Sequence, residues 1–430
     1  MFSLNGIRKY SKNKLFLTGF NYSIASTCNT LASMVMGILI IRWLNPHDLG
    51  VWNLISMFQA YFPFLQLGIQ NGLNRDLPVL LGAGKQEESK QLVATAKGYA
   101  FLIVLFFLFM AFLVPIILLF RGENKEMVWG VATICIIGAS MSLSIHLIAT
   151  YRSSKAFDKL TNIYFIQTIL IFFLGFFIYK YHYYGILIYN AINFSVIALL
   201  MYHWAPFKNE CAKFDKKSFK KLLSGGLVLM SFIQLRSAAQ TIPKWIILRF
   251  ANIATLGLFT PALAINGIIT MLPTQIAQFI HPQMGFKYGE TKKASSAWPY
   301  IKKLTFFLPL FSLPIVIAIW VAAPYLLENF FPKYTESLSA MRIMGIGFIF
   351  SSSFTTHGIL YTIRAYKPAY LYLFMETLGY FLFPYLFIKI GSSSILTAIA
   401  MGITINNITL YIINIVLLRI TLFLPKYNEE

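Results

Sequence analysis

Ionisable side chains occur inside long apolar stretches of the sequence, where a charge is costly. Glu376 lies deep in one such stretch and Arg236 in another. Gln240 and Lys244 follow Arg236 at four-residue intervals, so the three share one face of a helix. Because ionisable groups inside a membrane are expensive, each is a candidate functional residue. They could bind an anion, relay a cation or form an internal ion pair.

A second polar stripe consists of the amides Gln66, Gln70 and Asn74, which recur every four residues and end beside Arg75. Amides offer a glycan many neutral hydrogen bonds, and the planar guanidinium suits a phosphate or pyrophosphate. The alternative is that the amides only join helices to one another, and that the arginine extends to the membrane interface. The candidate residues for binding pyrophosphate or glycan are Arg75, Arg236, Gln66, Gln70, Gln240 and Asn74.

Three residues are candidates for coupling transport to an ion. Glu376 could bind the coupling ion, or it could be the structural partner of Arg236. His146 and His357 could relay protons, or they could be buried histidines with satisfied hydrogen bonds. The stretch Gly82–Gln86 lacks the spacing of a P-loop, and the sequence shows no His/Cys metal cluster and no Ser/His/Asp set. We therefore expect no catalytic residues, no metal, no cofactor and no enzyme activity.

The composition decides the class of protein that positions these residues. Hydrophobic residues make up 57% of the 430 positions, charged residues make up 12%, and the mean hydropathy is +0.66. Soluble domains carry about 25% charged residues. The chain is therefore a polytopic membrane protein, which excludes a nucleic-acid binder despite the net charge of +21. Three widely separated cysteines also exclude a secreted disulfide scaffold.

Twelve segments are long enough to span a membrane as helices. Each needs about 20 mostly apolar residues, because a helix rises about 1.5 Å per residue across a hydrocarbon core of about 30 Å. The expected spans are 16–41, 49–69, 98–120, 128–151, 162–179, 184–204, 222–248, 256–280, 304–327, 343–363, 369–390 and 395–418.

The distribution of basic residues orients these spans. Most of the 36 Lys and Arg residues fall on the side of the N-terminus, and Lys244 is assigned to the outer end of its span. This asymmetry predicts that both termini are cytoplasmic and that the basic loops face anionic lipid headgroups. The outer connections are short, the longest running from about residue 328 to 342, which leaves no room for an extracellular domain.

An internal repeat divides the chain. The pattern [IL]-R-[WF]-x-N-x-x-x-L-G-[VL]-[WF] occurs at 41–52 and again 207 residues later, and His146 is echoed by His357 after 211 residues. We expect two six-helix lobes, 1–210 and 211–430, in the same orientation and related by a pseudo-twofold axis along the membrane normal. The fold class is therefore all-α and polytopic, and the two-lobe layout is typical of alternating-access transporters.

The motifs in order resemble those of a known family. The segments Arg42–Leu44, Leu49–Trp52, Leu67–Ile69 and Gly72–Arg75 resemble the N-terminal region of bacterial polysaccharide (O-antigen type) flippases. These proteins belong to the multidrug/oligosaccharidyl-lipid/polysaccharide (MOP) exporter superfamily. A later echo is Phe331–Tyr334, and the resemblance extends over most of the chain.

The resemblance implies a MATE-like fold and ATP-independent movement of an undecaprenyl-pyrophosphate-linked oligosaccharide, an O-antigen or capsule repeat unit, across the bacterial cytoplasmic membrane. The implied partners are this substrate, membrane lipids, and the polysaccharide polymerase and chain-length machinery, with no nucleic acid. One alternative is a cation-coupled multidrug antiporter of the same fold, which the absence of buried acids in the first lobe disfavours. The other is a membrane polysaccharide polymerase or ligase, which the short outer loops disfavour.

Overall fold

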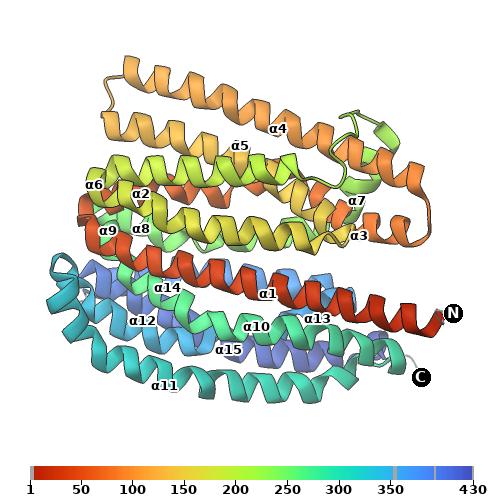
Figure 1. Ribbon diagram of the computed structural model, residues 1–430. Coiled ribbons are helices and arrows are strands. Elements are labelled where there is room, and N and C mark those ends of the chain that lie inside the picture. Colours follow the sequence, from red (N-terminus) through yellow and green to blue (C-terminus); the bar gives the residue numbers. More distant parts are fainter. Residues whose placement is uncertain (1–3, 352–355, 392–393, 429–430) are drawn as a thin grey trace. The chain divides into compact units, whose positions relative to one another are not determined.

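The computed structural model describes residues 4–351, 356–391 and 394–428, and most of them are helical (Figure 1). In chain order the helices are α1 (Leu4–Trp43), α2 (Pro46–Ser56), η1 (Met57–Ala60), η2 (Phe62–Gln66), α3 (Ile69–Gly82), α4 (Gln86–Phe120), α5 (Lys125–Ser153), α6 (Phe157–His203), α7 (Lys216–Ala239), α8 (Ile242–Phe250), α9 (Ile253–Leu258), α10 (Thr260–Thr291), η3 (Ala294–Ala297), α11 (Trp298–Phe330), η4 (Pro332–Ser337), α12 (Leu338–Ser351), α13 (Gly358–Thr362), α14 (Tyr366–Ile390), α15 (Ile395–Leu422) and η6 (Pro425–Tyr427).

Nine helical stretches within the described residues are long and apolar enough to cross a membrane. One of them, α6, has 47 residues, and non-helical backbone at His182 divides it between the expected spans 162–179 and 184–204. The expected spans 49–69 and 343–363 are each broken into shorter helices, and residues 352–355 lie outside the described part. The all-α polytopic membrane fold is therefore confirmed.

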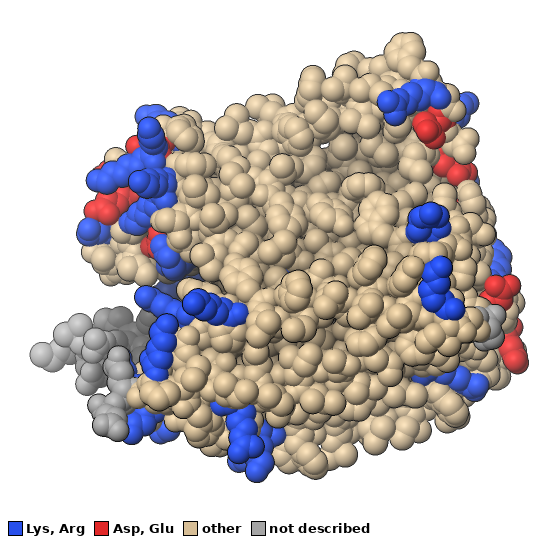
Figure 2. All heavy atoms as spheres, turned by 180° about the vertical axis from the view of Figure 1, so that it is seen from behind, with Lys and Arg blue, Asp and Glu red and all other residues tan. Residues whose placement is uncertain are grey.

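The surface agrees with a lipid environment. Large apolar side chains are widely exposed, among them Phe112, Phe120 and Phe173, whose exposed fractions are 70%, 88% and 70%. Figure 2 shows that Lys, Arg, Asp and Glu gather towards the two ends of the face that it presents, and most of the surface between consists of other residues. So large an apolar area on a soluble protein would drive association.

Two of the sequence expectations differ from the structure. Residues 70–97, expected to form a connection, are largely helical, because α3 ends at Gly82 and α4 already begins at Gln86. The expected span 222–248 lies within one candidate span of the structure, Lys216–Phe250, but its helix is interrupted at Gln240 and Thr241, between α7 and α8. Pro243 lies in the first turn of α8, where its missing N–H costs nothing, so the sequence favours a new helix start there.

The chain divides into two compact units. Unit 1 comprises Met1–Leu44 and Ile55–Gln234, and unit 2 comprises Asn45–Leu54 and Leu235–Glu430. The division follows spatial contact rather than the repeat, since the start of α2 belongs to unit 2 and most of α7 to unit 1. The lobe boundary between residues 210 and 211 stays a prediction.

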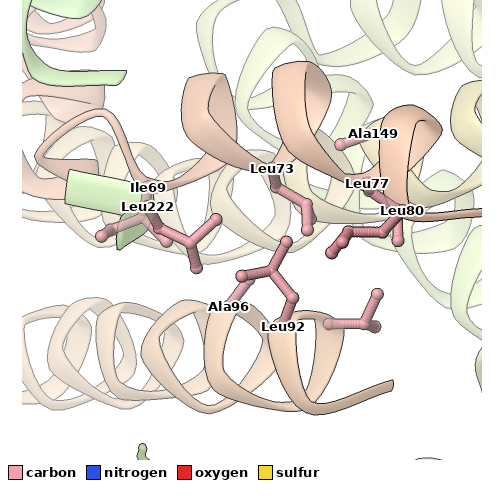
Figure 3. Close-up of a cluster of buried hydrophobic side chains, with 9 residues drawn as sticks. Ile69, Leu73, Leu77, Leu80, Leu92, Ala96, Ala149 and Leu222 are labelled. Atoms are coloured by element: carbon pink, nitrogen blue, oxygen red, sulfur yellow. The ribbon is translucent and has the colours of Figure 1, made fainter. Parts of the chain in front are cut away.

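In unit 1, α5 packs between α4 and α6, and α1 packs against α6. A buried cluster fixes α3 in this unit (Figure 3). Ile69, Leu73 and Leu77 recur every four residues and form one apolar face of α3. They meet Leu92 of α4 and Leu222 of α7. This packing leaves the more polar side of α3 to carry the predicted binding residues.

In unit 2, α15 packs against α12 and α14, and both copies of the repeated motif begin a helix. The Oδ1 atom of Asn45 accepts a hydrogen bond from the backbone N–H of Asp48 (2.8 Å). In the second copy Oδ1 of Asn252 accepts from the N–H of Thr255 (2.9 Å). Asparagine is a strongly preferred N-cap, because its side chain satisfies an N–H that the helix leaves unpaired. The conserved spacing of the motif is thus a helix-start signal.

The glycines of the two copies allow α2 and α9 to cross closely. A Cβ atom added at Gly50 would overlap the carbonyl oxygen of Ile253, and one added at Gly257 would overlap that of Pro46. The two contacts are reciprocal, because Gly257 lies 207 positions after Gly50 and Ile253 lies 207 positions after Pro46. Asn53 Nδ2 also donates to Thr260 Oγ1 (2.6 Å), across the same offset of 207. The repeated motif therefore packs against its own copy.

Candidate functional site

The buried amides of unit 1 lie where η2 leads into α3. Gln66 and Gln70 are both buried, and Oε1 of Gln70 lies 3.1 Å from Nδ1 of His146 on α5. Because Oε1 can only accept a hydrogen bond, Nδ1 carries the proton in this arrangement. The structure thus joins a predicted binding residue to a predicted coupling residue, a pairing that the separation of 76 positions did not reveal.

Arg75 lies on the exposed side of α3, next to exposed Asn74. Its guanidinium donates from Nε to Oδ1 of Asp76 (2.6 Å) and from Nη2 to Oδ2 (3.0 Å). Its side chain remains 57% exposed. A Cβ atom at Gly225 would overlap the guanidinium, so the glycine on α7 makes room for it. Arg75 was predicted from the sequence as a binding residue, but its contact with the carboxylate of Asp76 was not.

The charged residues of unit 2 form a buried ion pair between α7 and α14. Nε of Arg236 lies 3.2 Å and 3.1 Å from the two carboxylate oxygens of Glu376. The exposed fractions of the side chains are 25% for Arg236 and 2% for Glu376. Nδ2 of Asn406 also donates to the backbone carbonyl of Glu376 (3.4 Å). The sequence left two roles open for Glu376, binding of a coupling ion and pairing with Arg236. The structure shows the contact that pairing requires.

His357 is fully buried in unit 2 and contacts α14, the helix that carries Glu376 of the ion pair. Its ring centroid is 4.1 Å from that of Tyr372, which precedes Glu376 by four residues on α14. On the neighbouring α15, Nδ2 of Asn414 donates to Oγ1 of Thr356 (2.9 Å). An amide therefore lies beside each of the repeat-equivalent histidines, Gln70 beside His146 and Asn414 beside His357, and His357 also contacts an aromatic ring.

A cavity of about 300 Å³ in unit 2 begins where α7 gives way to α8. We call it the unit-2 cavity. It contains Gln240 of the predicted set and Lys244, which the set omitted although it follows Arg236 on the same helical face. The lining residues are Ser237, Gln240, Thr241, Pro243, Lys244, Phe259, Leu263, Asn266, Met344, Phe348, Tyr380 and Ile403.

The basic segment between α6 and α7, residues 204–215, is held to unit 1 by hydrogen bonds. Nζ of Lys97 on α4 donates to the carbonyl oxygens of Lys208 (3.0 Å) and Glu210 (2.8 Å). Asp215 then caps α7 by accepting from the backbone N–H of Ser218 (2.8 Å). Hydrogen bonds from Ser218 lower the pKa of the Asp215 carboxyl, since they favour its charged form.

A family match and several solved structures place this architecture among known proteins. The polysaccharide biosynthesis protein family matches residues 38–339, most of the chain. The chain belongs to that family. No curated protein matches the chain.

Solved structures of MATE transporters have the same fold as this chain. An inward-facing multidrug resistance MATE transporter of the MOP superfamily has 17% identity and a TM-score of 0.71, with 92% of this chain and 94% of that chain covered. A MATE in complex with MaD5 has 16% identity and a TM-score of 0.66, with 94% of each chain covered. An outward-facing MATE transporter of the same superfamily has 15% identity and a TM-score of 0.58, with 95% of each chain covered.

Together these findings confirm the resemblance to polysaccharide flippases of the MOP superfamily. They support a multi-pass membrane protein that acts as a transporter or flippase in polysaccharide biosynthesis. Within the described residues, no group of three or more His, Cys, Asp or Glu side chains could hold a metal ion. The roles of the individual candidate residues stay predictions.

Proposed function

We propose that this chain is a flippase for undecaprenyl-pyrophosphate-linked oligosaccharide, an O-antigen or capsule repeat unit, in the bacterial cytoplasmic membrane. The match of residues 38–339 to the polysaccharide biosynthesis family is the observation that carries the proposal. Two similar lobes would alternate between inward and outward access, with both termini in the cytoplasm. The polymerase and chain-length machinery would take the product on the outer side.

The two predicted arginines would differ in the free energy needed to exchange their carboxylate partner for the substrate. A diphosphate binding to either arginine competes with the carboxylate that already contacts it. Arg75 shares an exposed pair with Asp76, and such pairs contribute only about 0–1 kcal/mol, so the exchange is cheap. Arg236 shares a buried pair with Glu376, whose disruption leaves an uncompensated charge. Arg75 is therefore the better residue for the first contact with the pyrophosphate.

Ion coupling would also act through the buried pair. A proton or metal cation that reached Glu376 would have to displace Arg236 from both carboxylate oxygens. Binding of the cation and release of the arginine would then be linked events. His146 and His357 are proposed as secondary coupling residues, and each sits fully buried in its own unit.

Complementation tests the proposed function. A flippase-deficient strain that carries a cognate glycan cluster should regain surface polysaccharide and stop accumulating lipid-linked repeat units when it expresses this chain. At matched expression Arg75→Ala and Arg236→Ala should restore less surface polysaccharide, whereas Arg249→Ala, at the exposed end of α8, should behave as wild type. If wild type restores nothing with any cognate cluster, the proposal is wrong.

The shared fold with multidrug MATE transporters favours a second candidate, a cation-coupled drug antiporter. An antiporter needs an acid that can exchange a cation. Glu376 is the one acid among the described residues that is buried, and Arg236 contacts both its oxygens. Drug-driven proton exchange in vesicles, abolished by Glu376→Gln, would support this candidate, and its absence beside restored glycan export would reject it.

A further inference from the structure

The unit-2 cavity holds a lysine whose charge is not compensated within the described structure. Arg75 and Arg236 each contact a carboxylate. By contrast, Nζ of Lys244 has no carboxylate within ion-pair distance and no hydrogen bond to any described residue, although Lys244 lines the cavity. A cationic side chain in an apolar setting is costly unless something pairs with it.

The first turn of a helix reinforces this positive charge. Thr241, the N-cap of α8, and Pro243 and Lys244, which follow it, all line the cavity. The backbone N–H groups of Lys244 and Trp245 already donate to the carbonyl oxygen of Thr241, so the helix dipole is what makes the start of α8 favourable for an anion. In transporters, broken spanning helices place such half-helix ends beside anionic substrate groups. The break between α7 and α8 therefore adds to the effect of the lysine.

The rest of the lining suits a sugar. Oδ1 of Asn266 is buried and accepts no hydrogen bond within the part of the chain that the structure describes, so it needs a donor such as a hydroxyl group. Gln240 and Tyr380 add further polar groups, and Phe259 and Phe348 provide apolar walls. About 300 Å³ is at the small end of the range for ligand sites, so it suits one sugar or phosphate group rather than a whole repeat unit.

We infer that the unit-2 cavity binds an anionic group of the lipid-linked substrate, with Lys244 contacting its negative oxygens and Asn266 accepting a hydrogen bond from a neighbouring hydroxyl. The anionic group is either a phosphate of the diphosphate linker or the carboxylate of an acidic sugar. This inference rests on the proposed function, and it adds Lys244 of unit 2 to the candidate cations Arg75 and Arg236.

Binding measurements on the purified full-length protein test the inference. The probes are polyprenyl diphosphate alone and polyprenyl diphosphate carrying either glucose or glucuronic acid. Lys244→Met should bind the anionic probe about 10- to 30-fold more weakly, because a desolvated charge loses its partner. Lys244→Arg should retain most of the affinity. Lys389→Met, at an exposed position near the end of α14, is the matched control and should bind as wild type.

The probes separate the two sources of charge. Weaker binding of Lys244→Met to all three probes assigns the diphosphate, and weaker binding to the glucuronic acid probe alone assigns the sugar carboxylate. Asn266→Leu should weaken binding of the two sugar-carrying probes and leave the bare diphosphate unchanged. If Lys244→Met and Asn266→Leu both bind every probe as wild type does, the inference is overturned.

If the flippase proposal itself is wrong, the binding measurements should give a different result. If the wild type binds none of the lipid-linked probes, the flippase proposal is wrong, and soluble anions then decide the role of the cavity. Inorganic pyrophosphate or glucuronate, but not glucose, should raise the unfolding temperature of the wild type and not that of Lys244→Met. Equal shifts in both proteins, or none in either, would show that Lys244 binds no anion.

Discussion

The two units use equivalent histidines in different settings. In unit 1, His146 is hydrogen-bonded to Gln70, and the buried ammonium of Lys97 is the charged group that acts on it. In unit 2, the ring of His357 packs at a tilt against that of Tyr372, which lies one helical turn from Glu376 on α14. Both histidines are buried beside an amide, whereas the charges that act on them differ, Lys97 on His146 and Arg236 on His357. Helix starts and close crossings are shared between the copies, whereas the polar interior is specific to each unit.

The two units also differ in how deeply they bury their arginine–carboxylate pairs. Unit 1 carries its arginine pair, Arg75 with Asp76, on an exposed surface, whereas unit 2 buries Arg236 with Glu376. A buried pair is screened less than an exposed one, so charge changes in unit 2 should affect both stability and transport more strongly. The comparison predicts an order of mutational effects, from the buried pair to the exposed one.

Breaking the buried pair should have the largest effect. Glu376→Leu leaves the Arg236 charge uncompensated, which we expect to lower the free energy of unfolding by about 3–5 kcal/mol. Adding Arg236→Met should restore most of that loss, because replacing both charges by apolar groups is often neutral. Unfolding of the purified protein in detergent measures both effects.

The transport activity of the double variant then separates two roles for the pair. A stable double variant that no longer exports glycan would show that the charges act in transport. A stable double variant that exports normally would show that they only hold α7 and α14 together. No recovery of stability in the double variant would contradict the ion-pair account.

The reciprocal glycine contact should give the next largest effect, equal in both copies of the repeat. Gly50→Ala and Gly257→Ala each place a Cβ on a backbone carbonyl oxygen, and overpacking of this kind costs about 1–3 kcal/mol. Gly267→Ala is the control, because no atom of the described residues lies within 4 Å of its added Cβ. Thermal unfolding should rank the control above both variants, and a large difference between Gly50→Ala and Gly257→Ala would show that the crossing is not symmetric.

Much of the architecture could be predicted from the sequence, because apolar length and local motifs depend on neighbouring residues. The repeat at 41–52 and 248–259 indicated a duplication, and the structure explains its asparagine as a helix cap and its glycine as a crossing point. The broken span at Gln240 and Thr241 was not predicted, since mean hydropathy does not detect a local interruption.

The candidate site could be predicted only in part. Residue types and four-residue spacing identified Arg236, Gln240 and Glu376, but the pairing of His146 with Gln70 joins residues far apart in the chain. The four-residue spacing placed Lys244 on the same helical face as Gln240, but the loop-charge pattern assigned it to the outer end of its span, and the cavity that both residues line was not predicted. Contacts between distant segments depend on packing, which no local pattern contains.

The uncharged pair of unit 1 should be less sensitive than the charged pair of unit 2. Gln70→Leu removes the acceptor for His146 Nδ1, and an unsatisfied buried donor costs about 1–3 kcal/mol. Replacing both residues, Gln70→Leu with His146→Leu, should recover part of this loss. If the double variant also retains full glycan export, His146 takes no part in proton transfer, and a loss of export at unchanged stability would favour a coupling role.

The exposed pair should give the smallest change in stability and yet affect the substrate. Asp76→Asn removes the carboxylate from Arg75 at a surface where such a pair contributes about 0–1 kcal/mol, so unfolding should hardly change. The freed guanidinium should bind a polyprenyl diphosphate more tightly than in the wild type, most clearly at low ionic strength, where screening is weakest. Arg75→Gln should reverse that gain. Tighter binding in Asp76→Asn would place the first substrate contact on unit 1, whereas unchanged binding would leave that role to the cations of unit 2.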